Sequence, residues 1–265
     1  MSNLSWAFVY ASVVGTSHQR RDVGCQDYSI VEYFKVEDRT NRPIVYAAVS
    51  DGAGTSRFGA TGAELAVTIF RDEVFRELVH REGILSPEIL KSAILKTSTH
   101  IEEHATRLGH PCRDYAATLV CVILMPEKSW LIQIGDGAAV FGKNDGRWVQ
   151  HWPDNGEYAN ETFFITDDNV LDITHIEEID CPDEVTLLTD GLQPIALNLT
   201  AKEVHDPFFT SFYRVLKTRG EGYHEDLARS LALWMQTDLV NDRTDDDKSL
   251  VLINRTKSDV DHVVK

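Results

Sequence analysis

The most informative segment of the chain reads VYAAVSDGAG over residues 45–54, an apolar run that stops at an aspartate and continues with glycines. Residues 44–49 have the composition of a buried strand, because the run is short, apolar and bounded by Pro43 and Gly52. This strand would deliver the carboxylate of Asp51 to its end, where glycine lets the backbone fold back beside it.

The same pattern recurs twice along the chain. Residues 130–137 read WLIQIGDG and present Asp136, and residues 185–191 read VTLLTDG and present Asp190. A single Asp-Gly dipeptide is typical of a hairpin turn, so one copy alone would indicate only a turn. Three strand-end aspartates, with Asp27 and residues 245–247 beside further apolar runs, suggest parts of one oxygen-ligand site.

The length of 265 residues allows one large domain or two small ones. Because the candidate ligands extend from Asp27 to Asp247, a shared site requires nearly the whole chain to fold together. We therefore expect one domain over residues 1–254, followed by a polar tail over residues 255–265.

Charge and composition narrow the class of protein. The chain carries 42 acidic and 26 basic residues, a net charge of −16, and it has no Lys/Arg run, so we expect no nucleic-acid partner. The four cysteines lack a C-x-x-C pair, which favours free thiols over a zinc or disulfide framework. No signal peptide and no membrane-spanning run is evident, so we predict a soluble, cytoplasmic, monomeric protein without membrane contact.

The order of the predicted elements indicates an α+β fold with substantial antiparallel sheet. Apolar periodicity predicts helices over residues 56–81, 87–108, 201–217 and 223–239, and strands over residues 6–14, 28–34, 116–125, 130–134, 138–141, 148–152, 170–179, 185–189 and 249–253. Ser86 and Pro87 form the expected N-cap and first position of the second helix, with Ile89, Ala93, Leu95 and Ile101 available for one face.

Residues 153–169 are polar and irregular. A loop of this length on a compact domain is either a lid over a site or a surface excursion.

Dispersed aspartates without a His/Cys set favour Mg²⁺ or Mn²⁺ over zinc. Two such ions roughly 3.5–4 Å apart can share a water, lower its pKa and hold a phosphoryl oxygen. A phosphate also needs a planar cationic donor, which arginine supplies best. Arg20 and Arg21 lie just before Asp27, although ordinary surface arginines would have the same pattern.

These motifs, taken in order from Gly15 to Ile253, resemble the metal-dependent type 2C serine/threonine protein phosphatases. The matching pieces are Gln26-Asp27, Asp51-Gly52-Ala53-Gly54, Ala117-Thr118-Leu119, Gly135-Asp136-Gly137, Thr189-Asp190-Gly191 and Asp246-Asp247-Lys248-Ser249. The resemblance covers almost the whole chain.

The resemblance implies an α-β-β-α layered sandwich of two mainly antiparallel sheets flanked by helix pairs. It also implies that a water bridging two Mg or Mn ions attacks phosphoserine or phosphothreonine directly, with no phosphoenzyme. The implied substrate is a phosphorylated protein that is the target of a Ser/Thr kinase or is itself such a kinase.

The resemblance further assigns roles to individual residues. Asp51 would bridge both ions, the carbonyl of Gly52 would bind one of them, and Asp190 and Asp246 would bind the second. Asp27 would act through bound water, and Asp136 with Asp190 would hold a weaker third ion. The phosphate-contacting arginine would be Arg21 or Arg20, and His18 is a candidate general acid.

The chain also departs from the family pattern. Ala53 stands where many eukaryotic members carry a histidine, Pro194 replaces a further acidic ligand of the third ion, and Asp247 replaces an asparagine. Gly137-Ala138 in place of Ser-Arg resembles a compact bacterial branch, whose stand-alone members oppose Ser/Thr kinases.

Two alternatives fit the same residues. The departures are compatible with a catalytically weak module that binds a phosphorylated partner. The ligand set is equally suited to hydrolysis of a small phosphoester or nucleotide.

Overall fold

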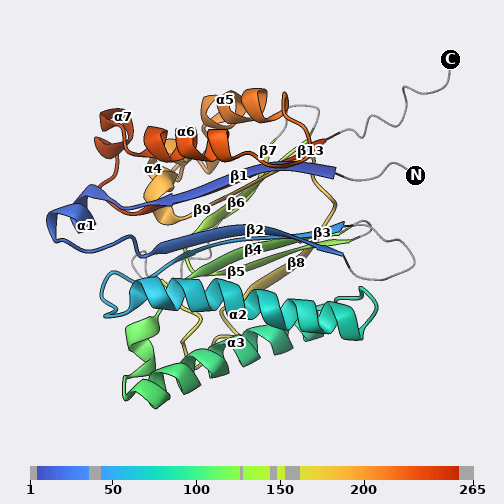
Figure 1. The fold of residues 1–265 in the computed structure, drawn as a ribbon, viewed down its shortest axis with the longest axis vertical. Helices are drawn as coiled ribbons and strands as arrows, with labels where there is room; N and C mark the ends of the chain where they lie inside the picture. Colours follow the sequence, from blue (N-terminus) through green and yellow to red (C-terminus); the bar gives the residue numbers. More distant parts are fainter. Residues whose placement is uncertain (1–4, 36–42, 126–127, 144–147, 153–161, 257–265) are drawn as a thin grey trace.

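The computed structural model describes residues 5–35, 43–125, 128–143, 148–152 and 162–256. These residues form four layers: two β-sheets packed face to face, with helices α2 and α3 outside one sheet and α4, α5, α6 and α7 outside the other (Figure 1). The predicted α-β-β-α sandwich is thereby confirmed.

The first sheet, within the described residues, has six strands in the order β12-β1-β13-β9-β6-β7. Its pairings are antiparallel except that of β1 with β12. The strands are β12 (Gly222–Tyr223), β1 (Ser5–Val13), β13 (Lys248–Thr256), β9 (Glu184–Leu188), β6 (Ala138–Gly142) and β7 (Trp148–His151).

The second sheet, likewise counted over the described part of the chain, has five antiparallel strands in the order β2-β3-β4-β5-β8. They are β2 (Asp27–Lys35), β3 (Pro43–Asp51), β4 (Leu119–Leu124), β5 (Ser129–Ile134) and β8 (His175–Ile179). A separate short hairpin pairs β10 (Leu197–Asn198) with β11 (Glu203–Val204).

The chain changes sheet between β5 and β6. The strands predicted over residues 116–125, 130–134, 138–141 and 148–152 follow one another at short intervals, which predicts one continuous meander. Instead β5 pairs with β4 and β8 in the second sheet, whereas β6 pairs with β7 and β9 in the first. The crossing takes place at Gly135-Asp136-Gly137, and the side chain of Gln133 holds it by donating to the carbonyl of Gly137 (2.8 Å).

Central strand β3 is buried on both faces, which explains its unbroken apolar run. Tyr46 and Ala48 pack in the layer beneath the helices, and Val45, Ala47 and Val49 pack between the two sheets. Successive strand residues point to opposite faces, so a strand covered on both sides has no charged position until it ends at Asp51, and the buried Ser50 before it donates its hydroxyl to the Thr118 carbonyl.

Helices α2 (Gly59–His80) and α3 (Pro87–Leu108) cover the second sheet. The predicted start of α2 at residue 56 is too early, because Ser56 donates its hydroxyl to the Arg113 carbonyl and Phe58 donates its amide to Asp114. These bonds fasten the preceding turn to the 3₁₀ helix η1 (Cys112–Tyr115). Helix α3 agrees with prediction, with the Ser86 hydroxyl accepting the Ile89 amide (3.4 Å).

The face predicted for α3 is partly wrong. Ala93 and Ile101 are buried as expected, but Leu95 is 50% exposed and Ile89 is only half-buried. Leu90 and Ile94 point into the core instead, because the stripe that contacts the sheet is offset by one position.

Helices α4 (Gln193–Ala196), α5 (Asp206–Leu216), α6 (Glu225–Met235) and α7 (Asp238–Asn241) cover the first sheet. The predicted helix over residues 201–217 is too long, because residues 197–204 form the β10–β11 hairpin and Pro207 lies in the first turn of α5. The predicted helix over residues 223–239 loses Tyr223 to β12 and is interrupted after Met235. None of the helices in the described ranges combines the length and apolarity required to cross a bilayer.

Residues 170–174 also differ from the prediction. Their alternating pattern predicted a strand over residues 170–179, but only His175–Ile179 form one. Local bonds hold the preceding turns, including the Thr174 hydroxyl donated to the Val170 carbonyl (2.5 Å) and the Asp172 amide donated to Asn169 (2.8 Å). The polar segment 16–27 also contains a short helix, α1 (Thr16–Arg20).

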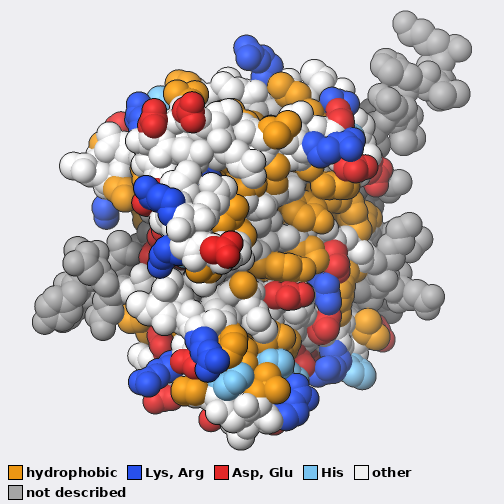
Figure 2. All heavy atoms as spheres, turned by 60° about the vertical axis from the view of Figure 1, so that its left-hand side comes forward, with side chains coloured by type: hydrophobic (Ala, Val, Ile, Leu, Met, Phe, Trp, Pro, Cys, Tyr) orange, Lys and Arg blue, Asp and Glu red, His pale blue; other side chains and the backbone are white. Residues whose placement is uncertain are grey.

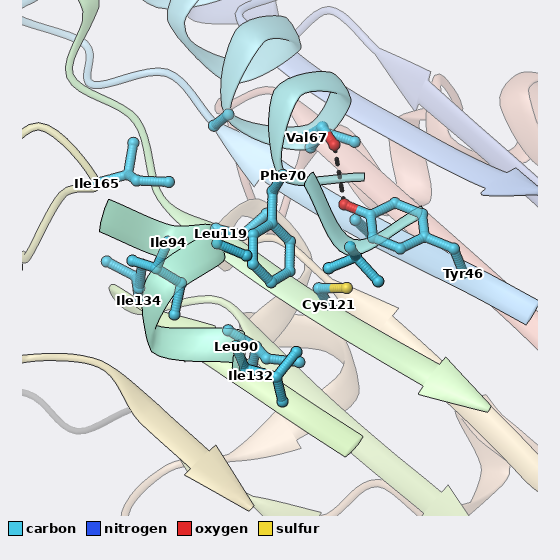
Figure 3. Packing of buried hydrophobic residues seen from close by; sticks show 14 of the residues in the cluster. Tyr46, Val67, Phe70, Leu90, Ile94, Leu119, Cys121, Ile132, Ile134 and Ile165 are labelled. Carbon is cyan, nitrogen blue, oxygen red and sulfur yellow. Dashed lines mark hydrogen bonds between the residues drawn. The ribbon is translucent and has the colours of Figure 1, made fainter. Parts of the chain in front are cut away.

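The core beneath α2 and α3 is drawn in Figure 3. Phe70 of α2 lies among Leu90 and Ile94 of α3 and residues of β4 and β5, and it is fully buried. Tyr46 of β3 points toward α2 and donates its hydroxyl to the Val67 carbonyl (2.9 Å), so this buried polar group is satisfied.

We expect Phe70→Ala to lower the free energy of unfolding by about 3–5 kcal/mol, because it removes a fully buried ring and leaves a cavity. Urea unfolding followed by circular dichroism measures this change. Val79→Ala on the same helix is the control, since Val79 is 66% exposed and its loss should cost less than about 0.5 kcal/mol. Equal losses in both variants would contradict the described orientation of α2.

Candidate functional site

Asp27 and Asp51 face each other at one end of the second sheet. Asp27 is the first residue of β2 and Asp51 is the last of β3, and the antiparallel register places them directly opposite. Directly opposed residues have Cβ atoms about 4.5–5.5 Å apart on the same face, so the two carboxylates are neighbours. The sheet register therefore creates the pair.

Thr118 holds the backbone of Asp51 in place. Its hydroxyl accepts the Asp51 amide (2.9 Å), and its own amide donates to the Asp51 carbonyl (2.8 Å). The next amide, of Gly52, donates to the Gln26 carbonyl (3.1 Å), which joins the segment after Asp51 to the segment before Asp27. These contacts give the Ala117-Thr118-Leu119 segment a physical role at the site.

Thr189 connects the two sheets at this point. Its hydroxyl donates to Oδ2 of Asp27 (2.7 Å) and accepts the amide of Ser249 (2.9 Å). Asp190 follows immediately and begins the 3₁₀ helix η2 (Asp190–Leu192). The hydrogen bond from Thr189 thus places Asp190, from the first sheet, beside the Asp27–Asp51 pair.

Asp247 joins the N-terminal loop to the beginning of β13. Its buried carboxylate accepts the amides of Gly15 (2.6 Å) and Gln26 (2.5 Å) and contacts Nδ1 of His18 (2.8 Å). The preceding residue, Asp246, is exposed.

Two glycines allow this close approach of backbones. A Cβ atom at Gly15 would collide with the backbone of Asp246, and one at Gly191 would collide with the carbonyl of Asp247. Any side chain at these positions would push the C-terminal aspartates away from the rest of the site.

Asp27, Asp51, Asp136, Asp190 and Asp246, here called the aspartate centre, interact through their charges. Burial raises the pKa of Asp51 well above its usual value, and the charges of Asp27, Asp190 and Asp246 raise it further. Burial followed by the charges of Asp136 and Asp246 raises the pKa of Asp190 to about 7. Burial also raises the pKa of Asp27, although the hydrogen bond from Thr189 lowers it in part.

The donor chemistry of the aspartate centre fits a hard divalent cation. Buried carboxylates that repel one another must either bind protons or share a positive ion. The centre offers oxygen ligands, as Mg²⁺ and Mn²⁺ require, and it draws them from both sheets. Asp27, Asp51, Asp190 and Asp246 are therefore the residues that could hold such ions.

Lys248 is a protein cation beside the centre. Its side chain is fully buried, and Nζ donates to the Asp246 carbonyl (3.1 Å) and to Asn241 (3.2 Å). Burial lowers the pKa of Lys248, although the charges of Asp247, Asp246 and Asp27 oppose this effect. One buried ammonium offsets only part of the negative charge of the centre.

Asp136 lies where the chain crosses between the sheets. Thr162 donates its hydroxyl to Oδ2 of Asp136 (2.7 Å), and the side-chain amide of Gln193 donates to the Asp136 carbonyl. Thr162 belongs to the segment 153–169, of which residues 153–161 lie outside the described residues. Ile165 of the same segment is buried against the core beneath the helices, so the described part is anchored to the domain.

The structure separates the remaining candidates by their environment. Arg20 is exposed and forms an ion pair with Asp245 (2.9 Å), whereas Arg21 is exposed and its Nε donates to the Ser17 carbonyl (3.3 Å). His18 is buried against Asp247 rather than lying on the surface. Figure 2, with the α1 side turned forward, shows basic side chains interspersed with acidic ones, and not one continuous basic patch.

Sequence reasoning identified the aspartates but missed the residues that position them. In the sequence, Thr189 and Lys248 stand out only as parts of motifs, and no sequence pattern predicts the contact of His18 with Asp247. The available signal was chemical: a threonine directly before a strand-end aspartate, and a lysine at the start of an apolar strand, both need buried partners.

Comparison with known proteins shows a family match over most of the chain. The family model described as protein phosphatase 2C matches residues 14–235. Serine/threonine-protein phosphatase 3 of Escherichia coli (strain K12) is 33% identical over 250 residues, which cover 94% of this chain and 98% of that protein.

Solved structures share the fold. The Mycobacterium tuberculosis serine/threonine phosphatase PstP/Ppp superposes with a TM-score of 0.61 at 13% identity, covering 96% of this chain and 100% of that one. The catalytic domain of the phosphatase PstP in complex with two manganese ions gives a TM-score of 0.56 at 15% identity, covering 96% of this chain and 100% of that one.

Stabilisation by Mn²⁺ should increase with pH. The pKa of Asp190 rises from its ordinary value of 3.8 to about 7 in the folded protein. Between these values the folded, cation-free protein binds more protons than the unfolded chain, so its free energy of unfolding falls as pH rises. Because a cation displaces those protons, Mn²⁺ at a hundredfold excess over its Kd should approach the full gain of about 2.7 kcal/mol only near neutral pH and above.

Thermal unfolding with and without Mn²⁺, from about pH 5 to about pH 8, measures this dependence. An increase in Tm on adding Mn²⁺ that is equal at both ends of the range would contradict it.

Thr189→Val should lower the free energy of unfolding by about 1–3 kcal/mol, because it removes the buried hydroxyl that donates to Asp27 and accepts the Ser249 amide. It should also weaken Mn²⁺ binding, measured by calorimetric titration. The matched control is Thr186→Val on β9, which removes a buried hydrogen bond to Tyr213 away from the aspartates. The control should lose stability but keep the Mn²⁺ affinity, and equal Mn²⁺ affinity in both variants would show that Thr189 does not position the centre.

Proposed function

Because the chain belongs to the protein phosphatase 2C family, we propose that it hydrolyses phosphoserine and phosphothreonine esters in proteins, using divalent cations held by the aspartate centre. The observation that carries this proposal is the convergence of carboxylates from both sheets, with the buried Lys248 beside them. Asp27 is buried, and Asp51, Asp136 and Asp190 are partly buried. Divalent metal dependence is a property of the family, and the acidic oxygen ligands suit it.

We propose Mg²⁺ or Mn²⁺ as the resident cations, two per chain. The support is the all-oxygen donor set and the two manganese ions in the PstP catalytic domain. Asp51 is proposed as the bridging ligand and the carbonyl of Gly52 as a ligand of one ion. Asp190 and Asp246 are proposed as the main ligands of the second ion.

Asp27 is proposed to act through bound water, and a weaker third ion is proposed at Asp136 and Asp190. The support for Asp27 is its position directly opposite Asp51, where the hydroxyl of Thr189 holds its carboxylate. Asp136 is supported by its charge interaction with Asp190.

When bound, the cation pair lowers the pKa of a water and neutralises charge on the phosphoryl oxygens. The protein's own groups supply position. Arg21 is proposed to bind the phosphate, because it is exposed and, in the described part of the chain, forms no ion pair, whereas Arg20 is held by Asp245. The new P–O bond forms to water as the ester oxygen of serine or threonine departs, and that oxygen takes up a proton.

For His18 we propose a positioning role in place of general acid catalysis. Its Nδ1 contacts Asp247, whose other contacts hold the amides of Gly15 and Gln26. His18 thus helps to hold the loop that carries Arg21 against the C-terminal aspartates. Water would then supply the proton to the leaving oxygen.

The cellular setting is also proposed. Each of the four cysteines, all within the described residues, is a free thiol, which suits the cytoplasm. The family and the E. coli relative favour a bacterial signalling enzyme that opposes a Ser/Thr kinase. All proposed ligands come from one chain and span both sheets, so residues 1–254 would act as one domain in a monomer, with β13 extending to Thr256.

Asp51→Asn should lower kcat/KM on a phosphothreonine peptide by about a thousandfold, roughly 4 kcal/mol of barrier, because the substitution weakens the proposed bridge between cations. Hydrolysis with Mn²⁺ present is followed by phosphate release. The control Asp226→Asn makes the same change at an exposed aspartate paired with Arg219 and should retain activity.

EDTA should abolish turnover by the wild-type protein, and excess Mn²⁺ should restore it. Comparable rates on free nucleotides and phosphoproteins would favour a small-molecule phosphoesterase, and phosphopeptide binding without turnover would favour a binding module. Activity that survives both EDTA and Asp51→Asn would refute the metal-dependent mechanism.

A further inference from the structure

His151, His175 and Glu177, here called the edge triad, form a second group of potential metal ligands. His151 is the last residue of β7, and β7 is the outer strand of the first sheet. His175 and Glu177 lie on β8, the outer strand of the second sheet, and share a face because they are two residues apart. The edge triad therefore links an outer strand of the first sheet to an outer strand of the second.

The three side chains converge on one point. Oε2 of Glu177 lies 2.9 Å from Nδ1 of His151 and 3.0 Å from Nε2 of His175. All three candidate ligand atoms lie within 4.8 Å of one another. Ligand atoms about 2.0–2.2 Å from a tetrahedral zinc ion are roughly 3.3–3.5 Å apart, so small side-chain movements would admit the ion.

We propose that the edge triad is a zinc site, separate from the aspartate centre. Two imidazole nitrogens and one carboxylate oxygen are a donor set typical of zinc with one remaining position. The aspartate centre offers oxygen only and suits Mg²⁺ or Mn²⁺, so the two sites select different ions by ligand type.

The edge triad lines a cavity, from which a further ligand could reach the ion. This cavity, of about 380 Å³, is lined by the edge triad together with Gln133, Gln150, Trp152 and Lys202. Water fits the fourth position, and Lys202 on the cavity wall favours a small anion there over a second cation. His175 and Glu177 have side chains that are 49% and 40% exposed, so the ion has a route from solvent.

Ion pairing alone accounts poorly for this geometry. Exposed ion pairs contribute about 0–1 kcal/mol, which is little reason for two histidines from different sheets to share one carboxylate oxygen. A metal ion would replace the shared protons with stronger bonds to the same three atoms. It would then fasten the edges of the sandwich to each other.

The test measures zinc binding directly, in the full chain with the Asp51→Asn substitution and excess Mg²⁺ to suppress zinc at the aspartate centre. Competition with a chromophoric chelator should give one tightly bound zinc per chain. His175→Ala and, separately, Glu177→Gln should each weaken zinc binding by roughly 100-fold or more, because each removes a ligand. Glu177→Gln keeps the size of the side chain, so a loss of zinc affinity in this variant is not explained by misfolding.

The matched control is His100→Ala, which removes a partly exposed histidine near Glu73 (3.9 Å) on another part of the surface and should leave zinc affinity unchanged. Co²⁺ substitution should add the visible absorption of a four-coordinate site in the parent, and this absorption should be lost in His175→Ala. Zinc affinity unchanged by both edge-triad substitutions, or an increase in Tm on adding zinc that the variants share with the parent, would overturn the proposal and leave an ion pair only. None of these measurements depends on phosphatase activity.

Discussion

Repulsion among the carboxylates of the aspartate centre is the constraint that the residues around the site must balance. Asp27, Asp51 and Asp190 are drawn together where two sheets end, and burial and mutual charge raise the pKa of each. An arrangement of this kind is unfavourable unless a cation or protons share the charge. The fold remains stable despite this unfavourable energy, because three hydrophobic layers stabilise the framework independently. One lies between the two sheets, and the other two lie between each sheet and its helices.

The framework holds the aspartates through a few neutral groups. Thr118 fastens the backbone of Asp51, and Thr189 connects Asp27 to the strand that precedes Asp190. Gly15 and Gly191 allow the backbone at residues 246–247 to approach within contact. These residues carry no charge, yet a change at any of them would move a carboxylate, because each one contacts an aspartate of the site or the backbone beside it.

Much of the fold could be read from the sequence because the strands of the core are apolar on both faces. The run that ends at Asp51 is an example, as is the capped helix that begins at Pro87. Segments governed by local hydrogen bonds were misread, such as residues 170–174, whose side chains alternate like a strand but whose backbone turns. The change of sheet at Gly135–Gly137 left no pattern, since an apolar strand looks the same in either sheet.

The candidate site could also be predicted only in part from the sequence. Strand-end aspartates are visible in a sequence, whereas the partners of Asp247 and Lys248 depend on contacts between distant segments. His151 and His175 lie on separate strands, and only the packing of two sheet edges brings them to one carboxylate.

The position of β13 has a consequence for synthesis of the protein. This strand lies between β1 and β9, so the first sheet has a gap at its centre until residues 248–256 leave the ribosome. Asp246 and Asp247 directly precede this strand. Asp246 completes the aspartate centre, and Asp247 binds the amide of Gly15. A growing chain can therefore pair the strands around β3 early, but the first sheet and the aspartate centre are complete only after residues 246–256 have been made.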